Sequence, residues 1–524
     1  MEKIIKLYHM KKTLLICVCA LCTSLTGFAQ NNITLLRDNL CKLRVLPWLV
    51  SASLEGSGHQ HYIYNQDFYD DAPKHYNDDA VLCVDKTGGG FSEIRISHPD
   101  DYAFVKFYEG ENDLYGIYST YERKTKTYAL YINTIGKEQS KAPWDPRKLV
   151  SVVSERGDGI YPYVAVSPNG QKAVVSIIQA GKKGKMKGSV VMVLGEGGEP
   201  LWENSFDPEF DNPTFFLADM ILSNDGSVYM AAVSYANETR KTRENEIFHL
   251  YEITDNNVQF ADQRIDFGYI CNGKLMMKKD GNIAFGGYFN NNLNEKAQGT
   301  YMLLFDNESD NVKNVSFKKF PSDYYEDTKG SLGTLKGSKM SVFVEDLYEF
   351  SNGTVAMLGE QREVIQRTVS SGNGMTTTNY TFHAKNILVS FADADGNLGD
   401  FEMINKYQMV GPLGAHYSLR LVRGYGFSFR SFLYNDKIQL LYADAMDNYL
   451  GKTGVVCKSM AQAKQCSALC TIDKDQQISK PVMIINPKEQ KTRMVSPLFI
   501  DEDGLLLINA AKKAGQLSKL SYEF

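Results

Sequence analysis

The sequence predicts an all-β protein, a β-propeller of four-stranded blades. A short unit recurs along the 524 residues, and its clearest copy spans Leu275–Phe285 with a turn at Asp280-Gly281. Apolar residues alternate on both sides of this turn, which is typical of a β-hairpin, because strand side chains alternate and Gly accepts the positive φ of a tight turn. The chain also holds 31 Tyr and 27 Phe but only 15 Pro. This composition favours sheet structure.

Residues 1–29 are predicted to be a signal peptide, and residues 30–524 a single β-propeller domain. Lys11 and Lys12 precede the apolar stretch Thr13–Leu25, and small residues precede the cleavage expected after Ala29. This stretch is short for a membrane span, and no later stretch is long enough. We therefore expect an exported protein without a transmembrane segment, located in the periplasm, at the cell surface or secreted.

The hairpin turn returns at a nearly constant period. The first five turns are 55 to 57 residues apart and the later ones 68 to 83 residues apart. The turn positions are Gly58, Asp113, Gly170, Gly226, Gly281, Gly353, Asp436 and Gly504. A period that lengthens through insertions is expected of a repeated blade. Apolar residues six and four positions before the turn support this alignment, although Lys172 and Glu349 occupy positions that should be apolar.

The number of blades follows from the ends of the chain. Each unit continues with a second hairpin, so that one repeat has four strands, as in a propeller blade. The last unit ends one strand short, and strand-like sequence precedes the first turn at residues 33–36 and 42–50. An N-terminal strand that completes the last blade would cover both open edges and close a ring of eight blades. If the segment around Gly58 is only an extension, the number is seven.

Two turn segments resemble the repeats of known bacterial propellers. Val164–Gly170 reads Val-Ala-Val-Ser-Pro-Asn-Gly and resembles the repeat of TolB-like propellers, which carries Ser-Pro-Asp-Gly before a strand. Asp280–Gly287 resembles the Asp-Gly repeats of other bacterial propellers. The resemblance covers about ten to fifteen residues of each unit. It implies the fold and no functional residue, because propellers serve many functions.

Charge and motifs exclude several classes of protein. The net charge of −5 becomes about −8 without residues 1–29, so general binding of nucleic acid is not expected. The sequence contains no Gly-x-Ser-x-Gly, no His-Glu-x-x-His, no phosphate loop and no dinucleotide fingerprint. We therefore expect no cofactor, and we expect a monomer.

Cysteine and histidine residues form two groups of interest. Cys457, Cys466 and Cys470 lie close together in the sequence, and an exported protein permits a disulfide among them. No His lies in that segment, so zinc is not expected there. His59 and His61 precede several Asp residues and are candidate metal ligands. The alternative, which we favour, is a polar and partly exposed segment without metal.

The variable loops indicate where a ligand binds. The turns inside the first hairpin are short, whereas the loops between hairpins and between units are long, and both long classes emerge on one face of a propeller. We expect function on this long-loop face, with drift of exposed loops as the alternative. Two loops combine aromatic residues with Arg, which suits glycan or peptide binding, although packing of the loops explains them equally. The candidate ligand-binding residues are Trp144, Arg147, Arg156, Tyr161, His416, Tyr417, Arg420 and Arg423.

The expected function is non-catalytic binding or scaffolding in the bacterial cell envelope, with a protein or a glycan as ligand. The first alternative is a propeller enzyme acting on glycans, a glycoside hydrolase or a lyase, and a hydrolase would need paired carboxylates. A sensory module is a further alternative. A centre lined by charged and aromatic side chains would favour a glycan ligand or the enzyme. An apolar centre with a flat aromatic patch would favour a protein ligand.

Overall fold

The structure is a computed structural model. It describes residues 36–521 except 44–49, 56–59, 66–75, 86–90, 156–157, 181–185, 207–215, 236–245, 292–295, 307–310, 322–340, 371–375, 415–426, 453, 459–464, 486–492, 502–503 and 512–513. The described residues form eight sheets and one short 3-10 helix, η4 (Met446–Tyr449). Six sheets have four strands each, one has five and one has six. The expected all-β fold of repeated, mostly four-stranded antiparallel sheets is confirmed.

The first four sheets are numbered by the chain order of their first strands. Sheet 1 consists of β2 (Val50–Glu55), β3 (Gln60–Asn65), β4 (Tyr76–Asp85), β5 (Phe91–Pro99) and β9 (Lys141–Ala142). Sheet 2 consists of β6 (Tyr102–Glu109), β7 (Leu114–Glu122), β8 (Thr127–Ile135) and β10 (Arg147–Val153). Sheet 3 consists of β11 (Gly159–Val166), β12 (Ala173–Ala180), β13 (Met186–Leu194) and β14 (Pro200–Phe206). Sheet 4 consists of β15 (Phe216–Leu222), β16 (Val228–Tyr235), β17 (Glu246–Ile253) and β18 (Val258–Arg264).

The last four sheets continue this numbering. Sheet 5 consists of β19 (Tyr269–Met277), β20 (Ile283–Asn290), β21 (Gly299–Asp306) and β22 (Asn311–Lys319). Sheet 6 consists of β23 (Ser341–Glu349), β24 (Val355–Ser370), β25 (Thr376–Ala392), β26 (Leu398–Ile404), β27 (Gln408–Gly414) and β30 (Cys457–Lys458). Sheet 7 consists of β28 (Phe429–Tyr434), β29 (Lys437–Ala445), β31 (Gln465–Asp473) and β32 (Val482–Ile485). Sheet 8 consists of β33 (Arg493–Asp501), β34 (Gly504–Ala511), β35 (Ala514–Ser521) and β1 (Leu36–Leu43).

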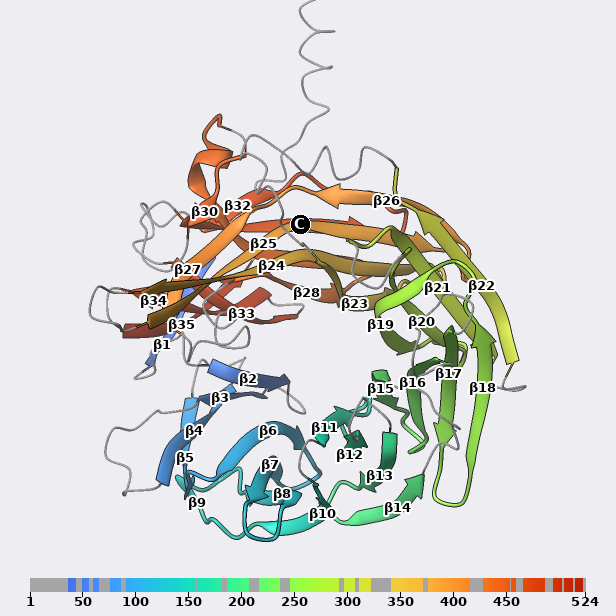
Figure 1. Ribbon diagram of the computed structural model, residues 1–524. Coiled ribbons are helices and arrows are strands. Elements are labelled where there is room, and N and C mark those ends of the chain that lie inside the picture. The colour runs from blue at the N-terminus through green and yellow to red at the C-terminus, as the bar shows by residue number, and fades with distance from the viewer. Residues whose placement is uncertain are drawn as a thin grey trace, which may run out of the picture.

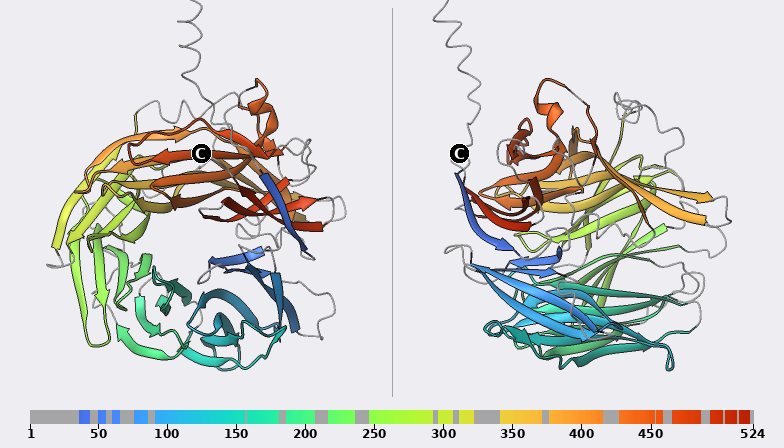
Figure 2. Two further views of the ribbon diagram at one scale, coloured as in Figure 1. Left: turned by 180° about the vertical axis from the view of Figure 1, so that it is seen from behind. Right: turned by 90° about the vertical axis from the view of Figure 1, so that its left-hand side faces the viewer.

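The sheets follow one another around a common centre, as in a β-propeller (Figures 1 and 2). The first strand of each sheet lies nearest the centre, and later strands lie progressively further out (Figure 1). First strands of neighbouring sheets contact one another along the series β2, β6, β11, β15, β19 and β23, and β28 contacts β33. Within the described residues, no helix is long and apolar enough to cross a membrane.

Sheet 8 combines both ends of the described chain. The N-terminal strand β1 pairs antiparallel with β35, with Leu36 opposite Ser521 and Leu43 opposite Gly515. This pairing gives β1 the outer edge of a sheet whose other three strands come from the C-terminal end. The N-terminal strand therefore lies where the incomplete last repeat predicts it.

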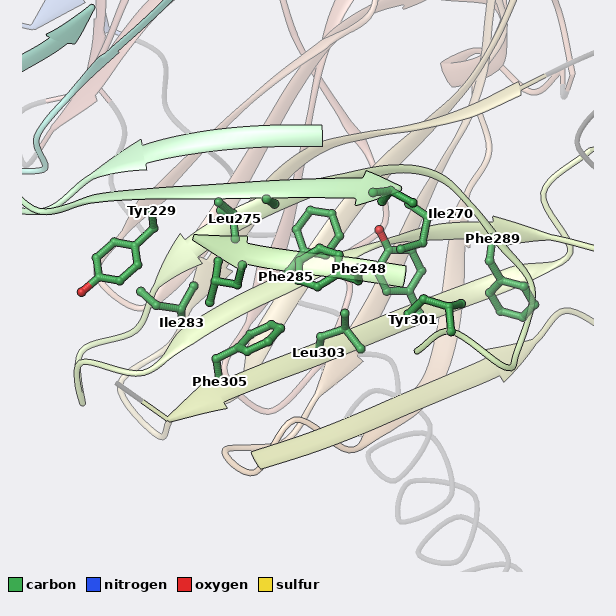
Figure 3. Packing of buried hydrophobic residues seen from close by; sticks show 14 of the residues in the cluster. Tyr229, Phe248, Ile270, Leu275, Ile283, Phe285, Phe289, Tyr301, Leu303 and Phe305 are labelled. Carbon is green, nitrogen blue, oxygen red and sulfur yellow. The ribbon is translucent and has the colours of Figure 1, made fainter. Parts of the chain in front are cut away.

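The hydrophobic core is divided into layers between neighbouring sheets. In the layer between sheets 4 and 5, Phe248 packs against Phe285 with ring centroids 4.7 Å apart (Figure 3). Between sheets 5 and 6, Gly359 makes room for the fully buried Tyr288, because a Cβ at residue 359 would lie 2.0 Å from the tyrosine hydroxyl. Alternating apolar positions thus bury both faces of a sheet, and small residues allow close approach.

The tight turns after the first strands have the predicted glycine chemistry. At Gly170, Gly226, Gly281 and Gly353, φ lies between +76° and +108°, and each amide donates to a carbonyl three residues earlier. Positive φ is easily reached by glycine, since it has no Cβ. The recurring Asp-Gly or Asn-Gly signal is therefore a local consequence of turn geometry.

The two charged residues that interrupt the apolar alignment make contacts between neighbouring turns. The Lys172 ammonium donates to the carbonyl oxygen of Asn224 in the turn of the next sheet. Glu349 Oε2 accepts a hydrogen bond of 2.6 Å from the amide of Lys279, and its Oε1 lies 4.0 Å from the ammonium of Lys278. These polar side chains thus connect sheets 3 and 4 and sheets 5 and 6.

The disulfide considered for the C-terminal cysteines is absent. Cys457, Cys466 and Cys470 are buried free thiols. Cys466 and Cys470 lie four residues apart on β31, which separates their Cα atoms by about 13 Å, too far for a disulfide. Burial raises the pKa of the Cys457 thiol to about 12 and that of Cys470 to about 11, so both are neutral thiols near pH 7.

Candidate ligand site at the centre of the sheets

Three of the eight sequence-predicted ligand residues, Trp144, Arg147 and Tyr161, lie within the described chain. Arg147 on β10 is exposed and donates from its guanidinium to the carbonyl of Gly198, and Tyr161 on β11 is 58% exposed. Trp144 is half-buried. Five predicted ligand residues and one predicted metal ligand lie outside the described residues, namely Arg156, His416, Tyr417, Arg420, Arg423 and His59. His61 lies on β3, but its side chain is likewise outside the description.

Trp144 covers a buried polar group between sheets 1 and 2. Its ring lies 5.2 Å from the His98 ring and 4.9 Å from the Tyr118 ring. His98 Nε2 lies 2.8 Å from a carboxylate oxygen of Asp79, and both residues are 1% exposed. Asp78, the other carboxylate in this part of the candidate metal cluster, pairs with an Arg. In the part of the chain that the structure describes, no three His, Cys, Asp or Glu residues are placed to hold a metal ion.

A different set of polar side chains recurs on the strands nearest the centre. In six consecutive sheets, the residue three positions before the last paired residue of the first strand is polar or charged. We call this set the inner polar ring. Its members are Lys106 on β6, Tyr163 on β11, Asp219 on β15, Lys274 on β19, Asp346 on β23 and Ser431 on β28. Because all six stand at the same distance from the turn, they lie at the same level of the arrangement.

Hydrogen bonds connect five members of the inner polar ring from sheet to sheet. The Tyr163 hydroxyl donates to Asp219 Oδ1, and the amide of Leu275 donates to Asp219 Oδ2 at 2.8 Å. Lys274 Nζ lies 2.9 Å from Asp346 Oδ1, and the Ser431 hydroxyl donates to Asp346 Oδ2 at 2.7 Å. These contacts link sheets 3, 4, 5, 6 and 7 around the centre.

Irregular backbone on the first strands helps to place these side chains. The pairing register shifts between Phe104 and Lys106, between Leu217 and Asp219, and between Val344 and Asp346. Each shift is a β-bulge that immediately precedes a member of the inner polar ring. A bulge changes the direction of the following side chain, so these residues need not follow the regular alternation of a strand.

Lys106 differs from the other members because no described residue is its hydrogen-bond or ion-pair partner. Its side chain is exposed. Desolvation and the nearby Lys274 ammonium lower the pKa of Lys106, and the Asp219 carboxylate only partly opposes them. The strands that carry the two lysines, β6 and β19, belong to sheets that are not neighbours and that lie on different sides of the centre (Figure 1).

The remaining charges of the inner polar ring are already compensated. Burial raises the pKa of the Asp219 carboxyl, although hydrogen bonds from Tyr163 and Leu275 act in the opposite direction. Burial lowers the pKa of Lys274, but the carboxylates of Asp346, Asp219 and Glu345 together outweigh it and raise the pKa of this lysine. The side chains of Lys274 and Asp346 remain 40% and 36% exposed. Among the described members of the inner polar ring, a ligand would therefore meet the unpaired cation of Lys106 and the accessible ion pair of Lys274 and Asp346.

A second constellation has the order of a catalytic triad but is closed to substrate. The Ser234 hydroxyl lies 2.6 Å from His249 Nε2, and His249 Nδ1 lies 2.5 Å from Asp262 Oδ1. This is the connectivity of a serine nucleophile, its base and an orienting carboxylate. However, Ser234 is 3% and His249 1% exposed between the sheets. We assign this group to satisfying buried polar atoms, as expected for a histidine in a core.

Sequence reasoning missed the inner polar ring, although a signal for it exists. Five of its members stand seven residues before the turn positions at 113, 170, 226, 281 and 353, next to the apolar positions that defined the alignment. Ser431 does not follow this spacing, because the turn between β28 and β29 is shorter and has only two residues, Asn435 and Asp436. A polar position that recurs beside an apolar one indicates a surface shared by all repeats.

Comparison with known proteins does not assign the chain to a family. No protein-family model and no curated protein sequence matches it. A protein of unknown function from Dyadobacter fermentans is 11% identical, with a TM-score of 0.30 over 70% of this chain and 99% of the other. An ulvan lyase of polysaccharide lyase family PL25 is 11% identical, with a TM-score of 0.38 over 59% and 75%. The β-propeller domain of the Trilobed protease from Pyrococcus furiosus is 9% identical, with a TM-score of 0.36 over 81% and 92%.

Proposed function

We propose that the chain is an exported, non-catalytic binding protein of the bacterial cell envelope, and that its ligand binds at the inner polar ring. The observation that carries this proposal is Lys106, an exposed cation on the innermost strand of sheet 2 that pairs with no other described residue and interacts electrostatically with Lys274 and Asp219 of other sheets. Ligand sites in proteins combine a concave surface with a few convergent polar groups. The long-loop face remains the expected route to this site.

We further propose that the eight sheets are eight blades of one closed propeller. The pairing of β1 with β35 supports this arrangement, because it joins the two ends of the chain in a single sheet. The eight sheets follow one another around the centre (Figure 1), which supports the count of eight over seven. Closure would leave each blade with only the short, protected edges that are usual in propellers.

The second candidate is an enzyme that acts on glycans. It is favoured by two carboxylates on the same ring, Asp219 and Asp346, of which Asp219 has a raised pKa. Glycosidases use two such carboxylates in unequal environments. Binding is preferred because both carboxylates already accept hydrogen bonds from protein groups, which hold them as connections between sheets.

A glycan array probed with residues 30–524 tests the proposal. The wild-type protein is expected to bind at least one saccharide, the Lys106→Met variant to lose at least ten-fold in affinity, and the Lys148→Met variant to bind as wild type. Lys148 is an exposed lysine on β10, the outer strand of the same sheet, and serves as the matched control. Equal binding by wild type and Lys106→Met would contradict a central site. Cleavage of a bound saccharide, seen as new chain ends by mass spectrometry, would favour the enzyme.

A further inference from the structure

We propose that the ligand of the inner polar ring is an acidic saccharide, with its carboxylate held by Lys106 and Lys274 and a neighbouring hydroxyl held by Asp346. This inference rests on the proposed function, since it names the class of ligand for that site. It follows from the two lysines that can still bind an anion, from the hydrogen-bonding groups beside them, and from the Asp219 and Asp346 carboxylates, which would repel a polyanion.

The cations at the centre favour a single negative group. Lys106 carries three donors and uses none on another described residue. Lys274 uses its donors on Asp346 Oδ1 and on the carbonyl of Glu345, which leaves one for a ligand. The surroundings of Lys106 disfavour its charge, because the nearby ammonium and desolvation outweigh the one nearby carboxylate. A bound anion would reverse this balance, so that binding and protonation of Lys106 support each other.

The acceptors at the centre require that the same ligand also donates hydrogen bonds. Asp346 receives Lys274 and Ser431, and its carboxylate, 36% exposed, retains lone pairs for further donors. Asp219 places a second carboxylate near Lys106. A compact polyanion such as a phosphate chain would be repelled by these two carboxylates. A ligand that carries one carboxylate and several hydroxyls satisfies both kinds of group.

An acidic sugar has this combination within one ring. In a uronic acid, the carboxylate and the nearest hydroxyl are attached to adjacent ring carbons, so one residue of a glycan can meet a lysine and an aspartate together. An acidic peptide also carries carboxylates, but its amide donors lie on the backbone, away from the acid groups. Hydroxyls rather than amides suit Asp346, which is already approached by the Ser431 hydroxyl.

Binding of matched probes tests this inference. The probes are oligogalacturonate and oligosaccharides that end in glucuronate, each as the free acid and as the neutral methyl ester, and a hexaglutamate peptide, measured by calorimetry and on the array. We expect at least one free acid to bind ten-fold or more tightly than its ester. Lys106→Met is expected to abolish this preference, Lys106→Arg to retain it and Lys148→Met to leave it unchanged.

The outcomes separate this inference from the function on which it rests. If acid and ester bind alike, or only neutral saccharides bind, and Lys106→Met still weakens binding, the central site stands and the acidic class is wrong. Tighter binding of hexaglutamate than of any saccharide would replace the glycan by an acidic peptide. If no saccharide or peptide binds, the proposed function itself fails. Unchanged thermal unfolding of the variants shows that the effects arise from the site.

Discussion

The Glu360→Gln substitution is expected to destabilise the protein strongly, because it removes a buried charge that two cations share. Glu360 on β24 lies 2.5 Å from Lys406 Nζ and 2.6 Å from Arg362 Nε, and it accepts a hydrogen bond of 2.5 Å from Ser428. The side chains of Glu360 and Lys406 are 0% exposed and that of Arg362 is 7% exposed. Gln retains the size and one acceptor oxygen, so the change isolates the charge.

The magnitude follows from which cation loses its counter-ion. Arg362 keeps a second carboxylate, because its guanidinium lies 2.5 Å from Glu345. Lys406 is left without a carboxylate in contact. Removing one partner of a buried ion pair lowers the free energy of unfolding by about 3 to 5 kcal/mol. We expect about 3 kcal/mol here, since burial lowers the pKa of Lys406, so that this lysine can lose its proton when its counter-ion is removed.

Urea unfolding at pH 7, followed by tryptophan fluorescence and circular dichroism, measures this effect. Asp400→Asn provides the control, since it breaks a pair of 2.5 Å with Lys318 in which the Asp400 side chain is 93% exposed, and it should leave the midpoint unchanged. The double variant with Glu360→Gln and Lys406→Met should recover most of the loss, because no unpaired charge remains.

The pH dependence has a definite sign. Burial opposes the ionisation of Glu360, but Lys406 and Arg362 outweigh it and hold the pKa of this carboxyl below its ordinary value. The stabilisation is therefore complete above the pKa of an unfolded Glu, about 4.3, and is lost as the pH falls through the lower folded value. A Glu360→Gln variant as stable as wild type at pH 7, or a difference that grows below pH 4, would refute this reasoning.

Two further substitutions test contacts between sheets. Gly359→Ala should lower the free energy of unfolding by about 3 kcal/mol, because its Cβ would lie 2.0 Å from the buried Tyr288 hydroxyl. An unchanged thermal midpoint would show that the packing between sheets 5 and 6 can rearrange to accept the methyl group. Lys278→Met should cost about 2 kcal/mol, because the side chain is 2% exposed beside the buried Glu349. The exposed Lys279 contributes its amide to that contact, so Lys279→Met is the control, and equal losses in both variants would contradict the assignment.

Features that depend on local sequence could be predicted, whereas those that depend on distant segments could not. The turns at Gly226 and Gly281 are visible in the sequence because positive φ selects glycine at the turn itself. The short strands β9 and β30 have no such signal, since each has two residues and gains its identity from a parallel neighbour in another unit. Their positions at the edges of sheets 1 and 6 appear only in three dimensions.

The same distinction holds for the candidate site. The inner polar ring, which contains Lys106 and Lys274, can be recognised in the sequence once the turns are aligned, because equivalent residues of a repeat occupy equivalent places. The electrostatic interaction between the two lysines cannot be recognised in the sequence, since it depends on how sheets 2 and 5 are arranged around a common centre. The assignment of Trp144 to a ligand site stays a prediction, because aromatic residues beside Arg occur both in packed loops and in binding loops.

The pairing of Leu36 with Ser521 sets the order of events during synthesis and folding. These residues are separated by 485 positions, so the first strand to be made must wait for the last. Closing so long a loop is slow, and until it happens β1 and β35 each present an unpaired edge. An unpaired edge can pair with a strand of another copy, so we expect a peptide with the sequence of β1, added in excess, to slow refolding of this protein.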